Sequence, residues 1–247
     1  MENCYFNHIA KDYHLKRKKP WKPFESFLLY LEKKGYTFKG LNIDLGCGNG
    51  RHFKLLQKRS FKLIGIDNSI EILKIARESL KDNDQDTNSK INFIQIVLAD
   101  LRFLPIRLNI IQNIFSIASI HHIKHKFERQ GAIKELFDLL KDNGYIIITV
   151  WRKWQKKYTS YFFHDWFRRM ISSTYKREQK TEGLDEFGDK YIPWKISSEK
   201  KKYNRFYHFF SKREIKKLIK TFKIQEFKIL GGPNNQDNFF ILAQKLK

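Results

Sequence analysis

The chain has 247 residues, 41% of them hydrophobic, and its 49 Lys+Arg against 26 Asp+Glu give a formal net charge of +23. No apolar run is long enough to cross a membrane and no secretion signal is visible, so we expect a cytoplasmic protein with no membrane association. Its 2 cysteines exclude a disulfide framework and a cysteine metal site, and we expect one domain over residues 1–247 with no bound metal.

The strong positive charge, together with 15% aromatic residues, indicates a polyanionic partner such as a nucleic acid. Nucleotide bias in the source genome is the alternative explanation, because it can add solvated lysines that have no function. An excess of this size produces a field that attracts polyphosphates whatever its origin.

Residues 1–40 are expected to form a helical extension ahead of the main fold. Apolar residues recur at helical spacing from Tyr5 to Tyr13, and a second helix is predicted over residues 24–31. The basic and aromatic segment between them, residues 16–23, contains two prolines and should be irregular. It is interpreted either as a solvated linker or as a lid over an anionic substrate.

Residues 41–50, with the sequence LNIDLGCGNG, organise the rest of the chain. A mostly apolar strand with Asp44 near its end leads into Gly46, Gly48 and Gly50, and then into a helix predicted over residues 51–58. Glycines let the backbone approach a ligand closely, and the helix directs its first amides at the ligand. Asp44 should anchor the loop or a ligand cation. The spacing differs from that of dinucleotide-binding loops, and such turns serve many nucleotides.

A second strand, residues 61–67, ends in Asp67 about 20 residues beyond the loop, where a carboxylate can bind the two hydroxyls of a ribose. Asn68 to Glu71 has the form of a capping box for a helix that continues to Leu80, which gives Asn68 a structural interpretation as well. A third strand, residues 91–98, is followed by Asp100, our candidate for contact with an adenine amino group.

A fourth strand, residues 110–120, leads into His121 and His122. A histidine pair at the carboxyl end of a strand lies beside the binding crevice of an α/β sheet and points to the substrate. A helix over residues 131–140 should stop at Asn143 and Gly144, and a fifth strand should cover residues 145–150.

The end of the chain completes an α/β doubly wound sheet. Ser211 to Glu214 is a second capping box, followed by a helix to about Lys220, a strand over residues 222–230 and a last strand over residues 238–243. The tight turn between these strands makes them antiparallel neighbours.

Residues 151–210 interrupt this pattern and are predicted to be a helical, aromatic substrate-binding insertion. Basic residues alternate with aromatic ones here, a combination that pairs with phosphates and stacks on unpaired bases. The alternative is a helical cap whose aromatic side chains form a core. Arg205, flanked by aromatic residues, fits the first interpretation better.

The glycine loop, Asp67 and the pair Asp100-Leu101 resemble, in their order and spacing, the class I S-adenosylmethionine-dependent methyltransferases. The resemblance implies a Rossmann-like seven-stranded sheet with an antiparallel last strand, and S-adenosyl-L-methionine as cofactor. It places Asp67 on the ribose hydroxyls, Asp100 near the adenine and the loop beneath the methionine moiety. The cofactor-binding residues that it implies are Asp44, Gly46, Gly48, Gly50, Asp67, Asn68, Asp100, Leu101, Ser116 and Ala118.

Shorter motifs are similar to the tRNA wobble-uridine carboxymethyl methyltransferases, a family that includes the yeast tRNA enzyme and the methyltransferase half of an animal AlkB-type fusion. They are R-x-K-P-W at 17–21, S-I-A-x-I-H-H at 116–122, V-W at 150–151, I-P-W at 192–194, R-x-Y-H-x-F at 205–210 and D-N-F-F at 237–240. The match runs from residue 5 to residue 243. The family often has proline at the position of Lys22 and two tryptophans at 239–240, where this chain has phenylalanines.

This resemblance implies methylation of the carboxylate of 5-carboxymethyluridine at the first anticodon position of a tRNA. Such a carboxylate is ionised at neutral pH, so no strong base is required. Arg17, His121 and Arg205 are then expected to form an electropositive pocket for the carboxymethyl group or the adjacent phosphate. The remaining substrate-binding candidates are Lys19, Trp21, His122, Trp151, Trp194, Tyr207 and Asn238.

The third strand predicts a partner protein. In the class I strand order it lies at an edge of the sheet, yet residues 91–98 contain no charge and no proline that would block pairing with another chain. The resembled family works with a small zinc-binding activator subunit that adds a strand, which implies a heterodimer here. The alternative is that a loop of this chain, residues 82–90, covers the edge.

Two other functions remain open. A methyltransferase for a small molecule or a protein would share the cofactor residues, but the basic and aromatic insertion and Arg17 would be unexplained. A catalytically inactive RNA-binding subunit is the second alternative, and the intact glycine loop, Asp67 and Asp100 argue against it.

Overall fold

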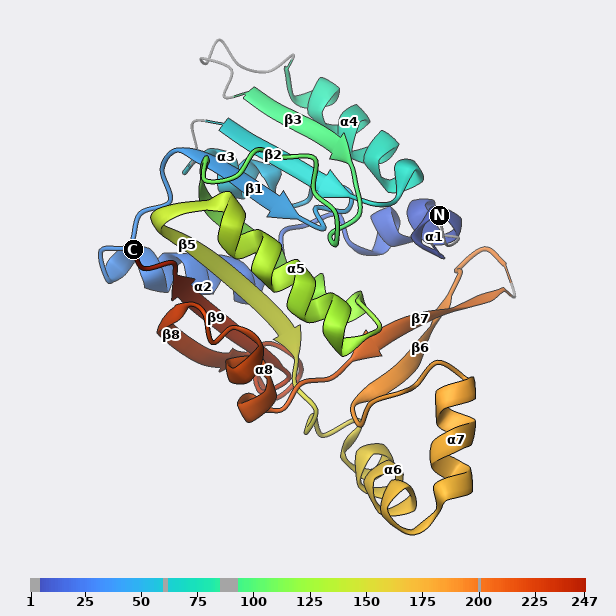
Figure 1. Ribbon diagram of the computed structural model, residues 1–247. Helices are drawn as coiled ribbons and strands as arrows, with labels where there is room; N and C mark the ends of the chain where they lie inside the picture. Colours follow the sequence, from blue (N-terminus) through green and yellow to red (C-terminus); the bar gives the residue numbers. More distant parts are fainter. Residues whose placement is uncertain (1–4, 60–61, 85–92, 200) are drawn as a thin grey trace.

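The structure is a computed structural model that describes residues 5–59, 62–84, 93–199 and 201–247. A seven-stranded sheet in the order β3-β2-β1-β4-β5-β9-β8 forms the centre of the molecule (Figure 1). Its strands are β1 (Leu41–Leu45), β2 (Lys62–Asp67), β3 (Phe93–Leu98), β4 (Ile111–Ile117), β5 (Leu140–Trp151), β8 (Lys223–Leu230) and β9 (Asn238–Gln244).

The first five strands run parallel, whereas β9 runs antiparallel to both of its neighbours, β5 and β8. This is the class I methyltransferase topology, and the predicted α/β sheet with its antiparallel last strand is confirmed. Strand order reverses between β1 and β4, the place where open α/β sheets bind their ligands.

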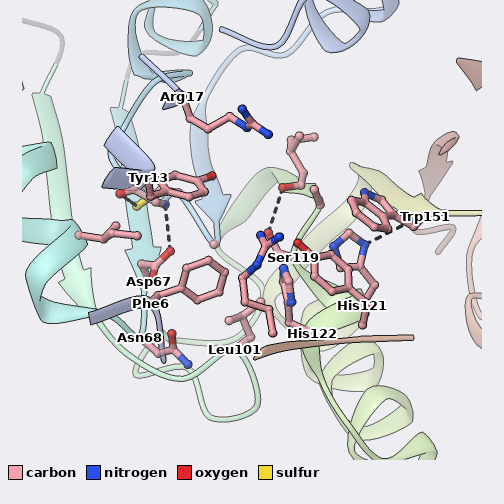
Figure 2. Close-up of a pocket in the computed structure, with 18 of the residues that line it drawn as sticks. Phe6, Tyr13, Arg17, Asp67, Asn68, Leu101, Ser119, His121, His122 and Trp151 are labelled. Carbon is pink, nitrogen blue, oxygen red and sulfur yellow. Dashed lines mark hydrogen bonds between the residues drawn. The ribbon is translucent and has the colours of Figure 1, made fainter. Parts of the chain in front are cut away.

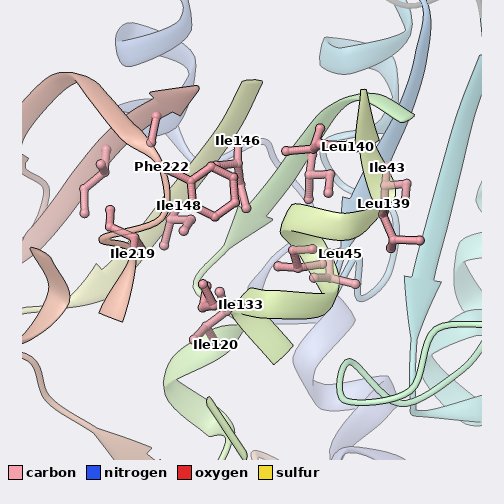
Figure 3. Packing of buried hydrophobic residues seen from close by; sticks show 14 of the residues in the cluster. Ile43, Leu45, Ile120, Ile133, Leu139, Leu140, Ile146, Ile148, Ile219 and Phe222 are labelled. Carbon is pink, nitrogen blue, oxygen red and sulfur yellow. The ribbon is translucent and has the colours of Figure 1, made fainter. Parts of the chain in front are cut away.

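Helices cover both faces of the sheet, because alternate residues of each central strand point to opposite sides. In β5, Ile146 and Ile148 pack into one buried cluster with α5 (Lys126–Leu139) and α8 (Lys212–Leu218), as Figure 3 shows in part. Ile147 between them enters the opposite cluster with α2 (Lys22–Lys33), α3 (Phe53–Gln57) and α4 (Ile70–Asp84). The apolar strands expected from the sequence are therefore buried on both sides.

Several predicted boundaries are wrong: α5 begins at Lys126 instead of residue 131, and β4 ends at Ile117 instead of residue 120. Strand β5 begins at Leu140, which pairs with Ile111, so Asn143 lies inside the strand at a φ of 64° and does not end the preceding helix. The cap of α4 is formed by Ser69 instead of Asn68, because Ser69 Oγ accepts the N–H of Ile72. The predicted capping box at Ser211 is confirmed.

The insertion between β5 and β8 contains more than the expected helices. It folds as α6 (Thr159–Ile171), α7 (Ser173–Thr181) and a two-stranded antiparallel sheet of β6 (Asp189–Lys195) and β7 (Lys202–His208). The helical pair projects from one end of the molecule, and the β6–β7 hairpin returns toward α1 (Tyr5–Lys16) at the N-terminus (Figure 1). The hairpin brings Trp194 and Arg205 back to the central sheet.

Strand β3 is at the edge of the sheet, where the sequence placed it, and pairs with β2. The loop that offered an alternative cover for this edge lies largely outside the described residues. No helix in the described part of the chain is long and apolar enough to cross a membrane.

Candidate active site

A cleft of about 1830 Å³ opens at the carboxyl ends of the parallel strands. Its lining combines α1, the glycine loop, the loops after β2, β3 and β4, and the β6–β7 hairpin (Figure 2). Pockets for one drug-sized ligand usually measure about 300–1000 Å³. This cleft is large enough for a cofactor and part of a second molecule.

The glycine loop adopts a backbone that only glycine tolerates easily. Gly46, Gly48 and Gly50 have φ values of 73°, 56° and 72°. A Cβ atom on Gly46 would lie 2.6 Å from Cβ of Ser119, whereas one on Gly48 would meet only Tyr13 of α1, at 3.7 Å. The loop is thus packed closely against Ser119, just after the end of β4, and leaves space above Gly48 on the cleft side.

Asp67 fixes this loop to the end of β2. Its carboxylate accepts the N–H of Gly48 at 2.9 Å through one oxygen and the N–H of Ser69 at 3.0 Å through the other. Burial raises the pKa of the Asp67 carboxyl, and these backbone N–H groups oppose the shift. Asp67 and Asn68 line the cleft together with Gly46 and Gly48, and we call these four residues with Ser69 the glycine-loop side.

Three of the expected cofactor residues do not line the cleft: Asp44, Gly50 and Ser116 lie beneath it. Asp44 is 1% exposed, and its Oδ2 atom has no hydrogen-bond partner in the described structure. Burial raises the pKa of Asp44 to about 7, although the charge of Arg51 opposes the shift. Asp44 and Ser116 can therefore act on a ligand only through the loop that they support.

Asp100 and Leu101 line the cleft next to the glycine-loop side. Arg102 clamps the Asp100 carboxylate with Nη2 at 2.8 Å and Nε at 3.0 Å, and also contacts Glu128 at 2.6 Å. Partial burial would raise the pKa of Asp100, but the Arg102 hydrogen bonds outweigh it and hold the pKa below its usual value. Asp100 is therefore a charged acceptor held in one orientation.

The end of β4 joins the two halves of the cleft. Ala118 has a φ of 58°, and its N–H donates to Thr149 of β5. Ser119 Oγ donates to the carbonyl of Leu45 at 2.8 Å, which bridges the carboxyl ends of β4 and β1. Sequence reasoning missed Ser119, because nothing in the local pattern indicates which strand its hydroxyl reaches.

His121 and His122 are both uncharged in this environment. Burial lowers the pKa of His121 well below its usual value and that of His122 to about 3. The backbone N–H of Trp151 approaches Nδ1 of His121 at 3.4 Å, so the ring proton of His121 is on Nε2, which has no partner among the described atoms. The expectation that His121 adds positive charge is corrected: it supplies a neutral N–H donor.

Arg205 is a buried cation between aromatic rings. It is 8% exposed, its guanidinium carbon lies 4.7 Å from the ring centre of Trp194 and 5.1 Å from that of Tyr207, and Nε has no hydrogen-bond partner. Within the described residues it makes no ion pair. Trp151 stacks on Tyr207 with ring centres 4.3 Å apart. We call Trp151, Trp194, Arg205 and Tyr207 the aromatic wall.

The other substrate candidates line the cleft in less specific ways. Arg17 and Lys19 are exposed at its rim, with the Arg17 guanidinium carbon 5.7 Å from the Trp194 ring. Trp21 packs on Phe240 of the core, with ring centres 5.0 Å apart, and therefore has a structural role as well. Asn238 is 5% exposed and donates to the carbonyl of Leu230.

Comparisons with known proteins agree with this geometry. Residues 43–148 match the family model described as a methyltransferase domain. A tRNA (carboxymethyluridine(34)-5-O)-methyltransferase from Schizosaccharomyces pombe is 26% identical over 97% of this chain and 94% of its own length. The Xenopus tropicalis protein of that name, alkbh8, is 24% identical, over 98% of this chain and 40% of its own length.

Solved structures share the fold. A SAM-dependent methyltransferase from Methanosarcina mazei superposes with a TM-score of 0.65 at 21% identity, over 87% of this chain and 97% of its own. One from Clostridium acetobutylicum gives a TM-score of 0.64 at 14% identity, over 99% and 100%. The chain is a class I S-adenosylmethionine-dependent methyltransferase.

In this methyltransferase, the residues that line the cleft fit the cofactor. The open space above Gly48 and the carboxylate of Asp67 beside it form a cradle that a side chain at position 48 would fill. The α1 residues Phe6 and Tyr13 also line this part of the cleft (Figure 2). Apart from their helical spacing, nothing in the sequence indicated that these two residues line the site.

One further cluster in the methyltransferase contains metal-ligand residue types. Ligand atoms of Glu186, Asp189 and His208 lie within 4.8 Å of one another. Both ring nitrogens of His208 already bind carboxylates, Nδ1 with Asp189 at 2.6 Å and Nε2 with Glu214 at 2.8 Å. The cluster is therefore a hydrogen-bonded network that ties the insertion to α8.

Proposed function

We propose that this methyltransferase esterifies the carboxylate of 5-carboxymethyluridine at the wobble position of a tRNA anticodon. The observation that carries the proposal is the buried Arg205 guanidinium, which faces the cleft without a described carboxylate partner. An unpaired buried cation is costly unless a ligand anion neutralises it. The names and alignment coverage of the fungal and amphibian relatives support the same substrate.

S-adenosylmethionine, when bound, supplies the electrophilic methyl group. On the protein side, we propose that Asp67 accepts the ribose hydroxyls, Asn68, Asp100 and Leu101 surround the adenine, and Gly46, Gly48 and Ala118 border the methionine moiety. Asp44, Gly50 and Ser116 hold the loop in shape from below. The charged state of Asp100, maintained by Arg102, suits an acceptor for an amino group.

The substrate carboxylate needs orientation and dehydration more than it needs a base, because a carboxylic acid with a pKa near ~4 is already ionised at pH 7. Arg205 provides the charge, and His121 provides an N–H donor from Nε2. Because His121 is neutral, it contributes a hydrogen bond but no second positive charge. A second positive charge would pull the nucleophilic oxygen out of line with the methyl group. Arg17 at the rim can contact the adjacent phosphate.

The aromatic groups fit a nucleotide. We propose that Trp151, Trp194 and Tyr207 enclose the uracil ring, with His122, Trp21 and Asn238 behind it and Lys19 near the backbone. Outside the cleft, α6 exposes Phe163, Trp166 and Phe167 at 56%, 44% and 50%. Exposed rings on a chain of net charge +23 can stack on neighbouring unpaired bases of an anticodon loop.

A protein partner is proposed at β3. The strand is an edge, and Leu98 at its end is 48% exposed. A small zinc-binding activator subunit would add a strand along β3 (Phe93–Leu98) and cover this edge; residues 91 and 92 of the predicted strand lie outside the described residues. Co-expression should then yield a stable heterodimer. A fully active, monodisperse monomer would contradict the proposed partner and would not bear on the proposed reaction.

The test of the reaction is transfer of a tritiated methyl group to tRNA that carries 5-carboxymethyluridine. We expect transfer that disappears after ribonuclease treatment and a product that loses its label in mild alkali, as a methyl ester does. Transfer to tRNA that lacks the carboxymethyl group, or alkali-stable label, overturns the proposal. Label in a small molecule or a protein would assign the enzyme to those substrates, and cofactor binding without any transfer would assign a binding role.

A further inference from the structure

Asp12 of α1 is a buried carboxylate that neither the cofactor nor the substrate assignment uses. This carboxylate is 8% exposed and accepts the indole N–H of Trp194 at 2.7 Å, the backbone N–H of Ser197 at 2.9 Å and Nζ of Lys16 at 2.6 Å. Burial alone would raise the pKa of Asp12, but these three donors hold it well below its usual value. A permanently charged acceptor on α1 thus holds a tryptophan of the β6–β7 hairpin.

Asp12 binds the indole of Trp194, and the Arg205 guanidinium packs against this indole. The Trp194 ring centre lies 4.7 Å from the Arg205 guanidinium carbon, and Nζ of Lys16 lies 5.0 Å from the same ring. A cation on a ring face is sensitive to the ring's orientation, because the attraction comes from the negative face and not from the edge. The hydrogen bond from Nε1 to Asp12 sets that orientation.

The opposite end of α1 is bound to the glycine-loop side. Asn7 Oδ1 accepts the hydroxyl of Ser69 at 2.7 Å and the N–H of Glu71 at 3.3 Å, and the Ser69 N–H donates to Asp67. Helix α1 contacts both α4 and β7, and it lies between α4 and the β6–β7 hairpin in Figure 1. One helix therefore connects the carboxylate proposed for the ribose to the cation proposed for the substrate.

We propose that Asp12 is a positioning residue for the anion site at Arg205, acting through Trp194. The inference rests on the proposed function only for the identity of the anion, since the geometry requires only that an anion binds Arg205. Asp12 orients the Trp194 ring, and the Trp194 ring orients the Arg205 guanidinium. Helix α1 holds this arrangement in a fixed position relative to the cofactor cradle.

The test is Asp12→Asn in the full chain. An amide has one acceptor oxygen, so either the Trp194 indole N–H or the Ser197 N–H loses its acceptor and faces an NH₂ group. We expect KM for the tRNA to rise about ten-fold with kcat changed less than about two-fold and with the affinity for S-adenosylhomocysteine retained. The indole ¹H–¹⁵N resonance of Trp194 should shift.

Asp165→Asn is the matched control. Asp165 is 2% exposed, accepts from Arg169 and from the Tyr175 hydroxyl, and does not line the cleft. The Asp165→Asn variant should have lower thermal stability than the wild type and an unchanged KM for the tRNA. If the two variants change stability and KM alike, the role of Asp12 is structural and the proposal is overturned.

A second variant and an anion probe separate this inference from the proposed substrate. Trp194→Phe keeps a ring but removes the N–H, and it should raise KM as Asp12→Asn does. Inorganic sulfate, titrated at constant ionic strength, should shift the Trp194 resonance in the wild type and not in Arg205→Ala, and Asp12→Asn should require about ten-fold more sulfate. If sulfate shifts the Trp194 resonance of the wild type but the enzyme does not act on tRNA, only the proposed substrate is refuted. An unchanged sulfate response in Asp12→Asn refutes the positioning role.

Discussion

The glycine-loop side and the aromatic wall face the same cleft but are built differently. The glycine-loop side comes from the ends of two neighbouring parallel strands, and backbone hydrogen bonds such as Gly48 N–H to Asp67 hold it together. The aromatic wall comes from β5, β6 and β7, and one side chain orients the next, as Trp194 does for Arg205. Substitutions on the glycine-loop side should therefore act through the backbone, whereas substitutions in the aromatic wall should affect substrate binding alone.

Gly46→Ala should have the largest effect. A Cβ at this position collides with Ser119, and the φ of 73° costs a non-glycine residue about 1–2 kcal/mol in addition. We expect the affinity for S-adenosylhomocysteine, measured by calorimetry, to fall more than about 100-fold and the unfolding temperature to drop.

Gly35→Ala is the matched control for Gly46. Gly35 has a φ of 89° and nothing within 4 Å of a Cβ, so it should show only the backbone cost and normal cofactor affinity. Equal losses of affinity in both variants would contradict the argument that contact with Ser119 shapes the loop.

Arg205→Ala tests the aromatic wall. Loss of a buried, charge-assisted contact to the substrate anion should lower kcat/KM for tRNA about 100- to 1000-fold, with cofactor affinity within about two-fold of the wild type. Arg205→Lys should recover only part of the activity, because an ammonium cannot reproduce the planar stack between Trp194 and Tyr207. Unchanged turnover in Arg205→Ala would remove the main support for the proposed substrate.

Asp44, beneath the glycine-loop side, gives that side a pH dependence. Burial raises its pKa to about 7, so between about pH 4 and pH 7 the folded state keeps a proton that the unfolded chain has released. This carboxyl therefore lowers stability as the pH rises through that range. Relative to the wild type, Asp44→Asn should gain up to roughly 4 kcal/mol in unfolding free energy between pH 4 and pH 8.

Urea unfolding of both proteins at several pH values measures the effect of Asp44. Glu182→Gln, at an exposed position on the insertion, is the control for removal of a carboxyl group from the surface. A stability difference between Asp44→Asn and the wild type that is the same at every pH would contradict the assignment.

Trp166→Ser should have the smallest effect. If its exposed ring stacks on one base, the affinity for tRNA should fall about ten-fold, and methylation of a minimal carboxymethyluridine nucleoside should not change. Ile229→Ser on β8, where the side chain is 37% exposed, controls for loss of a surface apolar group. Filter binding at fixed salt measures both variants, and equal affinities for tRNA would exclude α6 from the RNA contact.

The fold was largely predictable because its signals are local. Apolar runs, the glycine spacing and the capping box at Ser211 each depend on a few consecutive residues, and all three led to the observed sheet. The start of β5 was wrong because a distant partner decides it: Ile111 pairs with Leu140 and extends β5 past Asn143. The cap of α4 was wrong by one residue, because Ser69 and not Asn68 binds the N–H of Ile72.

The candidate site was predictable in part. Family motifs pointed to Arg205 and His121, but not to the neutral state of His121, which follows from burial and the N–H of Trp151. Asp12, Ser119 and Tyr13 carry no motif, because their roles depend on neighbours more than 30 residues away in the chain.

The sequence by itself determined the α/β sheet, the glycine loop and the acid after β2, because backbone preference and hydrophobic period act over a few residues. Only the tertiary structure decided what faces the cleft. It buried Asp44 and Ser116, bound Arg102 to Glu128 of α5 and left Arg205 buried without a described carboxylate. The physical reason is that burial and charge pairing depend on which distant segments meet, and the β6–β7 hairpin and α1 meet only in the folded chain.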